Sequence, residues 1–170
     1  MSNMSNNNSH KENDQLPTGT ATLLEQRMFQ AQVAECLIES YAEVMGYDRA
    51  IEVATAAIQA DAKKSGRKMA EKYDGNSLKE LSRIVKEIWC AGDALSITVL
   101  EETENTFSFD VNRCRYAELY EKMGIGKLGV CLSCSRDSAF AKGFNPHIKM
   151  QRTQTIMEGA PYCDFRFTLD

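Results

Sequence analysis

Apolar residues in the first half of the chain recur at helical spacing. They fall every three or four positions over residues 22–45, and the same period continues over residues 48–73. Ser77 is followed three residues later by Glu80, a pairing typical of the capping box that begins a helix. We therefore predict three consecutive helices. The charged, Ala-rich stretch 60–72 is expected to project into solvent.

Two pairs of segments in the second half alternate apolar and polar residues with the period of a strand. Residues 95–100 and 107–111 are joined by a short polar loop, which predicts an antiparallel hairpin. Residues 153–157 and 162–169 alternate again on either side of Gly159-Ala160-Pro161. They predict a second hairpin at the end of the chain.

Helical spacing returns between the two predicted hairpins, over residues 115–123 and 128–142. The order helices, hairpin, helices, hairpin is typical of an α+β domain, with an N-terminal helical layer packed on an antiparallel sheet made of two hairpins. Residues 1–19 are polar and lack any periodicity, so we expect a disordered leader there. Residues 20–170 are expected to form a single domain.

The charge balance excludes some classes of partner. The chain of 170 residues has 20 Lys and Arg against 24 Asp and Glu, a formal net charge of −4, and neither half is basic. This argues against nucleic-acid binding, which needs clustered cations. No run of about 18 apolar residues and no secretory signal is present, so we expect no membrane partner and a cytoplasmic location.

Six cysteines would be reduced thiols in that compartment. Cys36 and Cys90 lie within apolar helical patterns and are expected to fill the core. The other four are Cys114, Cys131, Cys134 and Cys163. Four thiolates could hold zinc tetrahedrally, which is the main structural alternative. Because Cys131 and Cys134 form the single C-x-x-C pair and no His lies at ligand spacing, we expect no metal and no cofactor.

Arginines and aspartates are interleaved with these thiols. Arg136-Asp137 follows Cys134, and Asp164 follows Cys163. A thiolate beside an arginine has a lowered pKa and becomes a usable nucleophile, although composition by itself favours structural ion pairs. Strand parity places Cys163 on an apolar face and Asp164 on the opposite face. These two side chains therefore cannot share a pocket unless the strand bends.

Five ordered motifs resemble one known family, that of L-2-amino-thiazoline-4-carboxylate hydrolase. They are the runs 112–118, 132–137, 143–146, 152–156 and 159–165, and the strong resemblance spans residues 112–167. The last run is also distantly similar to 4-vinyl-reductase-type domains, which share an α+β fold with transport-particle subunits. This second likeness agrees with the order of elements predicted above.

The resemblance implies a hydrolase that opens a small carboxylate-bearing heterocycle at a C=N or amide-like carbon, as in conversion of 2-amino-thiazoline-4-carboxylate to carbamoyl-cysteine. Such chemistry needs a nucleophile or activated water, an acid for the departing ring atom and a cation for the carboxylate. The matching thiols and carboxylic acids are candidates for catalysis: Cys114, Cys134, Cys163, Asp137 and Asp164. The matching substrate-binding candidates are Arg113, Arg136, Asn145 and Arg152. Cys131 is interpreted as a chance addition beside the matched motif.

Among the three thiols, Cys134 is the preferred nucleophile and Cys163 its rival. On a regular helix Asp137 shares the face of Cys134, whereas Arg136 projects about 200° away. An arginine from elsewhere, such as Arg113 or Arg152, would then have to lower the thiol pKa.

Three alternatives stay open at this point. Water activated by an aspartate could replace the thiol, and the same Arg and Cys pocket could belong to a non-catalytic sensor of small molecules. The third alternative concerns the oligomeric state, because the chain could form a homo-oligomer. The expected partner is a small-molecule substrate.

Overall fold

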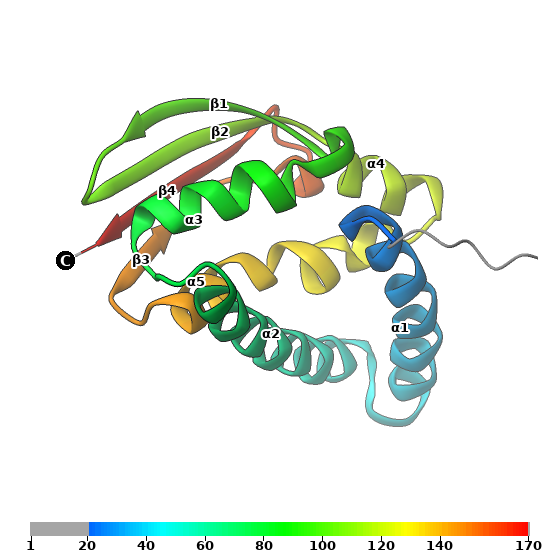
Figure 1. Ribbon diagram of the computed structural model, residues 1–170. Helices are drawn as coiled ribbons and strands as arrows, with labels where there is room; N and C mark the ends of the chain where they lie inside the picture. Colours follow the sequence, from blue (N-terminus) through cyan, green and yellow to red (C-terminus); the bar gives the residue numbers. More distant parts are fainter. Residues whose placement is uncertain (1–20, 170) are drawn as a thin grey trace, which may run out of the picture.

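Three helices begin the part of the chain that the computed structural model describes, residues 21–169 (Figure 1). They are α1 (Leu23–Met45), α2 (Tyr47–Lys72) and α3 (Leu78–Ile84), which continues as a π-helical turn, η1 (Val85–Trp89). The predicted capping box is present: the Ser77 side chain caps α3 and the Glu80 carboxylate accepts the Ser77 amide. The predicted leader, residues 1–19, lies outside the described residues.

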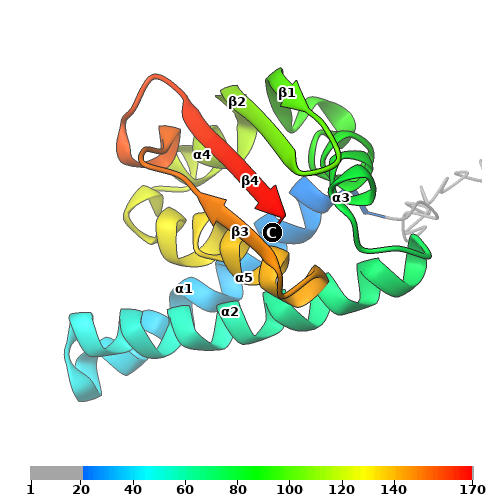
Figure 2. The same ribbon diagram turned by 90° about the vertical axis from the view of Figure 1, so that its left-hand side faces the viewer.

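The strands form one four-stranded antiparallel sheet of order β1-β2-β4-β3. They are β1 (Leu95–Glu102), β2 (Thr106–Cys114), β3 (Ile148–Gln151) and β4 (Cys163–Leu169). Figure 2 shows the helices gathered on one side of this sheet, with its other side open. The predicted fold class, helices packed on an antiparallel sheet, is confirmed.

The predicted second hairpin is wrong in its first strand. β4 pairs with β2 on one side and with β3 on the other, and residues 152–155 leave the sheet before the short turn η5 (Ile156–Glu158). The reason lies in the backbone donors. The amides of Thr153 and Gln154 donate to the Asp164 carboxylate, and the amide of Ile156 donates to the Cys163 sulfur. Donors bound to these side chains are not available for a strand ladder.

The helical segment predicted over residues 128–142 is not one regular helix. After α4 (Arg115–Lys122) the chain forms η3 (Gly126–Leu128), a π-helical turn η4 (Val130–Cys134) and α5 (Arg136–Phe144). A further short turn, η2 (Ala91–Asp93), precedes β1. The Ser135 amide donates to the Val130 carbonyl, the five-residue spacing that defines a π turn. This irregularity lies beside the pocket described below.

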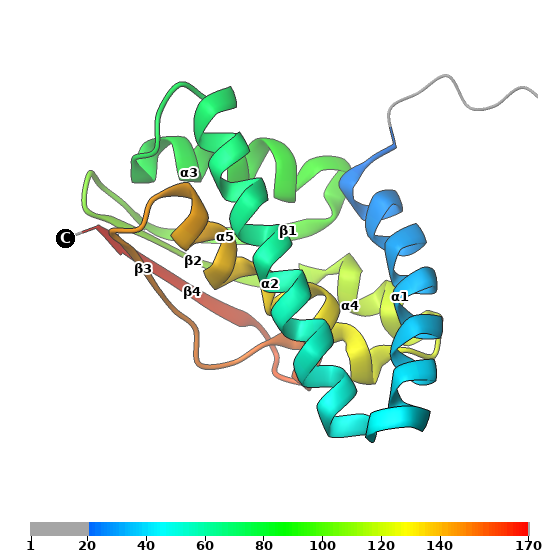
Figure 3. The same ribbon diagram turned by 90° about the horizontal axis from the view of Figure 1, so that it is seen from below.

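Helix α2 packs along α5, so the expectation that residues 60–72 project into solvent is wrong (Figure 3). Ala62 and Gly66 are buried in this contact. A Cβ on Gly66 would lie 2.6 Å from the Phe144 nitrogen, and one on Gly143 would lie 2.7 Å from the Lys63 Cα. The two helices approach this closely because glycine stands on both sides.

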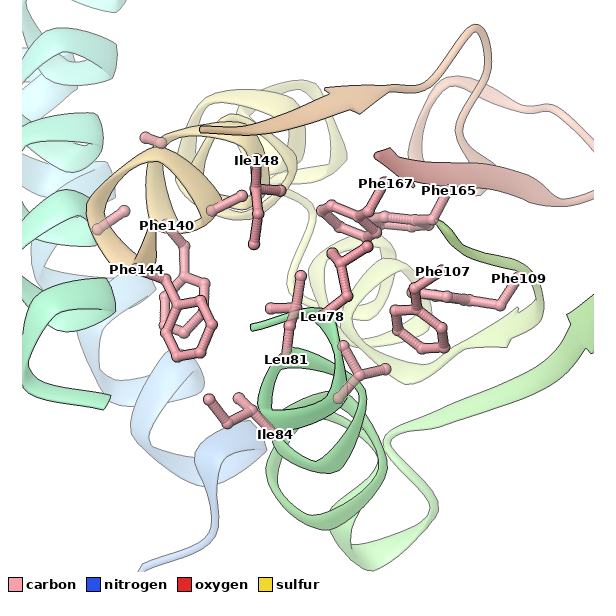
Figure 4. Close-up of a cluster of buried hydrophobic side chains, with 14 of the residues drawn as sticks. Leu78, Leu81, Ile84, Phe107, Phe109, Phe140, Phe144, Ile148, Phe165 and Phe167 are labelled. Atoms are coloured by element: carbon pink, nitrogen blue, oxygen red, sulfur yellow. The ribbon is translucent and has the colours of Figure 1, made fainter. Parts of the chain in front are cut away.

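Two hydrophobic clusters fill the interior. The sheet cluster joins α3 and α5 to the inner face of the sheet, where the Phe109 and Phe165 rings stack at 4.9 Å (Figure 4). The helical cluster joins α1, α2, α4 and η4 and has fewer buried residues, of which Tyr120 is the largest. Cys90 packs partly buried against the sheet cluster, but Cys36 is exposed on α1, which corrects the expectation that it fills the core.

Candidate functional site

A cavity of about 370 Å³ lies between the sheet cluster and the helical segments α1, α4 and η4. Its apolar wall comes from the sheet cluster and includes Trp89, Phe140 and Phe165. Its polar wall comes from α1, α2, α4 and the junction of η4 with α5. Both π-helical turns border the cavity, with Trp89 on η1 and Cys134 on η4. Such turns are frequent at functional sites.

The cavity brings together the three thiols that the sequence singled out. Cys114 ends β2, Cys134 ends η4 and Cys163 begins β4, and all three line the cavity. Burial raises the pKa of each, to about 11 for Cys114. The positive charge of Arg152 opposes the rise in the Cys134 pKa but does not overcome it. The expected lowering of the Cys134 pKa is therefore absent, and the thiol is neutral at physiological pH.

Asp137 and Arg152 form an ion pair at the same place. Arg152 Nη1 donates to Asp137 Oδ2 at 2.5 Å, and Arg152 Nη2 donates to the carbonyl of Cys134 at 3.0 Å. The guanidinium also lies over the Phe165 ring, 5.0 Å from its centroid. Burial raises the pKa of Asp137 in spite of the cation beside it. A carboxylate with a raised pKa is a better proton acceptor than an ordinary one.

Arg136 also lines the cavity, which corrects the expectation that it projects about 200° away from Cys134. That angle assumed a regular helix, whereas the π turn ends at Cys134 and α5 begins at Arg136. Arg136 and Asp137 both line the cavity from the first turn of α5. Arg136 Nη2 donates to Asp61 Oδ2 of α2 at 2.7 Å, and this bond holds the pKa of Asp61 below its usual value.

Helices α1 and α4 contribute residues that the sequence reasoning missed. Arg27 of α1 lines the cavity, with Gln26 and Gln30 beside it, and Tyr116 of α4 lines it as well. The Tyr116 side chain is buried, and its hydroxyl has no hydrogen-bond partner among residues 21–169. Tyr116 lies inside a matched motif, which could have pointed to it. Nothing in the pattern around Arg27 distinguishes it from other charged positions on α1.

Three predicted site residues lie outside this cavity. Asp164 faces the other side of β4, as strand parity indicated, and binds Thr153 and Gln154. Although burial opposes it, these hydrogen bonds hold the pKa of Asp164 below its usual value. Arg113 pairs with Glu118 on the surface at 2.6 Å. Asn145 ends α5, where it donates to the Asn76 carbonyl and accepts the His147 amide.

Cys131 lies apart from the other three thiols. It is buried in the helical cluster, where the Thr55 hydroxyl lies 3.2 Å from its sulfur. Within residues 21–169, no three His, Cys, Asp or Glu side chains are arranged to hold a metal ion. None of the helices in the same range is both long and apolar enough to cross a bilayer.

Two solved structures share the fold with this chain. The phenol-responsive sensory domain of the transcription activator PoxR, solved with phenol, superposes with a TM-score of 0.53 at 12% identity, covering 82% of this chain and 73% of that one. Subunit 3 of a trafficking protein particle complex from Naegleria fowleri, covalently bound to palmitic acid, superposes with a TM-score of 0.52 at 8% identity, covering 86% and 96%. Both likenesses concern the fold, and they agree with the distant resemblance noted in the sequence.

The sequence comparisons found a family for this chain but no individual curated relative. A search of curated proteins returned no match. The family model for L-2-amino-thiazoline-4-carboxylic acid hydrolase matches residues 26–167, which include Arg27 of the cavity wall as well as the C-terminal motifs. Because this match spans most of the chain, the protein belongs to the L-2-amino-thiazoline-4-carboxylic acid hydrolase family.

Proposed function

We propose that this protein hydrolyses a small carboxylate-bearing heterocycle at a C=N or amide-like carbon, as in the opening of 2-amino-thiazoline-4-carboxylate to carbamoyl-cysteine. The family is named for a hydrolase, and the ring and the bond that breaks are our proposal. One observation carries it: Cys134, Asp137 and Arg152 meet in a single cavity of about 370 Å³. That volume suits a small ring.

In the proposed reaction Cys134 is the nucleophile and Asp137 the general base. The thiol is neutral in the free protein, so it must lose its proton as it attacks, and the raised pKa of Asp137 suits that carboxylate to accept it. Attack forms a bond between sulfur and the C=N carbon and moves the π electron pair to the ring nitrogen. This pair then re-forms the C=N bond as the bond from the same carbon to the other ring heteroatom breaks, and that atom leaves with the proton from Asp137, which opens the ring.

Water completes the cycle by adding to the same carbon and displacing the Cys134 thiol. The net change is the addition of one water molecule to the substrate. Arg152 orients the base in this scheme, because one guanidinium binds both the Asp137 carboxylate and the carbonyl of Cys134. Water activated directly by Asp137 is the alternative if the thiol proves dispensable.

The test is turnover of a panel of cyclic amidine, imidate and lactam carboxylates, followed by mass spectrometry. We expect Cys134→Ala to lose at least about a hundredfold in kcat/KM while it keeps its fold, because the covalent step is removed. Cys36→Ala is the matched control, since this thiol is exposed on α1. If Cys163→Ala is folded but inactive while Cys134→Ala is active, the nucleophile is Cys163 and not Cys134. If all three variants stay active, the nucleophile is water and not a thiol; these variants are Cys114→Ala, Cys134→Ala and Cys163→Ala.

A non-catalytic sensor is the second candidate, and a specific observation favours it. Burial raises the pKa of every thiol in the cavity, so none of them rests as a thiolate. The sensory domain of PoxR, which has a similar fold, is phenol-responsive. Saturable binding of one panel compound with no product from any of them would favour the sensor over the hydrolase.

A further inference from the structure

The cavity carries more positive than negative charge. Arg27, Arg136 and Arg152 line it, against Asp61 and Asp137. The excess charge lies on Arg27, because Arg136 pairs with Asp61 and Arg152 with Asp137, whereas Arg27 forms no ion pair within residues 21–169. Its Nη1 donates to the neutral side chain of Gln30, one turn along α1, at 2.5 Å.

The charge of Arg27 is in an unfavourable position in the cavity. Burial lowers its pKa, and repulsion from Arg136 lowers it further. Two guanidinium groups from different helices, α1 and α5, are thus held near each other, and the Asp61 carboxylate forms its ion pair with Arg136 and not with Arg27. A bound anion would relieve this repulsion, and a carboxylate can accept the planar donors of both arginines.

Tyr116 provides a second, independent observation at the same place. Only 7% of this residue is exposed, and its hydroxyl has no hydrogen-bond partner among the described residues. Leaving a buried hydroxyl unpaired costs about 1–3 kcal/mol. Tyr116 lines the cavity and its hydroxyl interacts electrostatically with Arg27, so a ligand that bridges them would supply the missing acceptor.

The other candidate anchors are already occupied. Arg152 binds Asp137 and the Cys134 carbonyl and covers the Phe165 ring. Arg113 lies outside the cavity in its pair with Glu118. The carboxylate-binding role expected of these two residues therefore has a better candidate in the unpaired Arg27. Arg136, its neighbour, can assist, because the carboxylate that pairs with it, that of Asp61, is largely exposed.

We propose that Arg27, Arg136 and the Tyr116 hydroxyl form a carboxylate-binding subsite, so that α1 selects small organic acids for this cavity. That this carboxylate is the substrate's own rests on the proposed function. The side chain of Asp61 is 63% exposed, which places the subsite toward the open side of the cavity. The ligand ring then lies deeper, against Trp89 and Phe140 and toward Cys134.

Asp61 opposes binding of the ligand carboxylate in this arrangement. Its carboxylate occupies a donor of Arg136 that the ligand would use. Asp61→Asn removes the competing charge while it keeps the shape of the side chain. We therefore expect Asp61→Asn to bind acids a few-fold more tightly than the unmodified protein, whereas loss of Arg27 weakens the same binding.

Calorimetric binding of L-thiazolidine-4-carboxylate, and of its neutral carboxamide, tests the subsite without turnover, because this saturated ring lacks the C=N bond. Arg27→Gln is expected to weaken binding of the acid about tenfold to a hundredfold, the range for a hydrogen bond to a charged group, and to leave the carboxamide within about twofold. Arg27→Lys should restore part of the loss, and Tyr116→Phe should cost less than Arg27→Gln. Arg49→Gln, on the exposed surface of α2, is the matched control and should change neither.

The outcomes separate this inference from the proposed function. Arg27-dependent binding of the acid, together with no turnover of any panel compound, would support the subsite and contradict the hydrolase. Turnover with an unchanged KM in Arg27→Gln would support the hydrolase and contradict the subsite. Acid binding that Arg27→Gln changes by less than about twofold, or no binding of the acid to the unmodified protein, overturns the subsite.

Discussion

The two hydrophobic clusters on either side of the cavity differ in size and in what they hold. The sheet cluster is built around six Phe rings, at positions 107, 109, 140, 144, 165 and 167. The helical cluster contains no Phe and one Tyr, at position 120, and α1 contributes only Ala31 and Ile38 to it as fully buried residues. The sheet side carries Cys163 and the ring beneath Arg152, whereas α1 carries Arg27.

This difference suggests a division of labour between the two walls. Reaction chemistry needs groups held within a fraction of an ångström, and the stacked rings of the sheet cluster provide a densely packed base for Arg152 and, through α5, for Asp137. Cys134 stands at the boundary, because η4 packs in the helical cluster and leads into α5. Recognition of a ligand tolerates a wall held by fewer apolar contacts, which α1 supplies. The outer face of α1 is itself apolar and exposed, with Val33 at 63% and Val44 at 85% exposure.

Truncation of one residue in each cluster should give the largest contrast in stability. Phe109→Ala is expected to cost about 3–5 kcal/mol, because it removes a fully buried ring stacked on Phe165. Ile38→Ala should cost about 2 kcal/mol, the lower end for its type, because α1 has only two fully buried residues and can shift to close the space. Urea denaturation of both variants measures the difference. Equal losses would show that α1 is held as firmly as the sheet.

Removal of Arg152 should cost about 3 kcal/mol at neutral pH, because Asp137 would be left charged and without its cation. Burial already raises the pKa of Asp137, and loss of the cation raises it further, so the folded state favours the protonated acid. The deficit should therefore be smallest below the ordinary carboxyl pKa of 3.8 and grow as the pH rises through the raised pKa.

Denaturation of Arg152→Ala at about pH 4.5 and pH 7.5, each against the unmodified protein, checks this slope. Arg166→Ala is the matched control, because Arg166 pairs with Asp110 on the open side of the sheet and keeps 33% of its side chain exposed. It should cost about 1 kcal/mol, in line with a surface pair. A deficit in Arg152→Ala that stays constant with pH would contradict the role given to Asp137.

Gly66→Ala should destabilise the protein by about 1–3 kcal/mol, although alanine normally favours a helix. The added Cβ would meet the backbone of α5 at Phe140 and Phe144, so α2 and α5 would have to move apart. Ala57→Gly, at an exposed position of the same helix, is the matched control and should cost about 1 kcal/mol from propensity. A stabilised Gly66→Ala would mean that the two helices can separate without loss.

Substitutions on the outer face of α1 should have the smallest effect. Val33→Thr and Val44→Thr are expected to change the unfolding free energy by less than about 0.5 kcal/mol, because both side chains are already exposed. Thermal denaturation at several protein concentrations measures this. A loss above about 1 kcal/mol that depends on concentration would show that another molecule covers this face.

Short-range patterns were enough to predict much of the fold. The helical periods, the capping box at Ser77 and the alternation over 95–111 all act between residues close in the chain, and the structure has each of these elements. Where long-range contacts compete, the prediction fails. Residues 153–157 alternate like a strand, but Asp164 and Cys163 of β4 take the amides that the strand would need.

The candidate site divides along the same line. The amino-acid sequence by itself determined which residue types were available, and the matched motifs identified Cys114, Cys134, Asp137, Cys163 and Arg152 before any geometry was known. Which of them share a cavity depended on how β2, β4, α5 and η4 pack together. The raised thiol pKa values and the unpaired Arg27 arise from burial between segments distant in sequence. Only the tertiary structure could decide them, because burial and the distance between charges are properties of the packed chain.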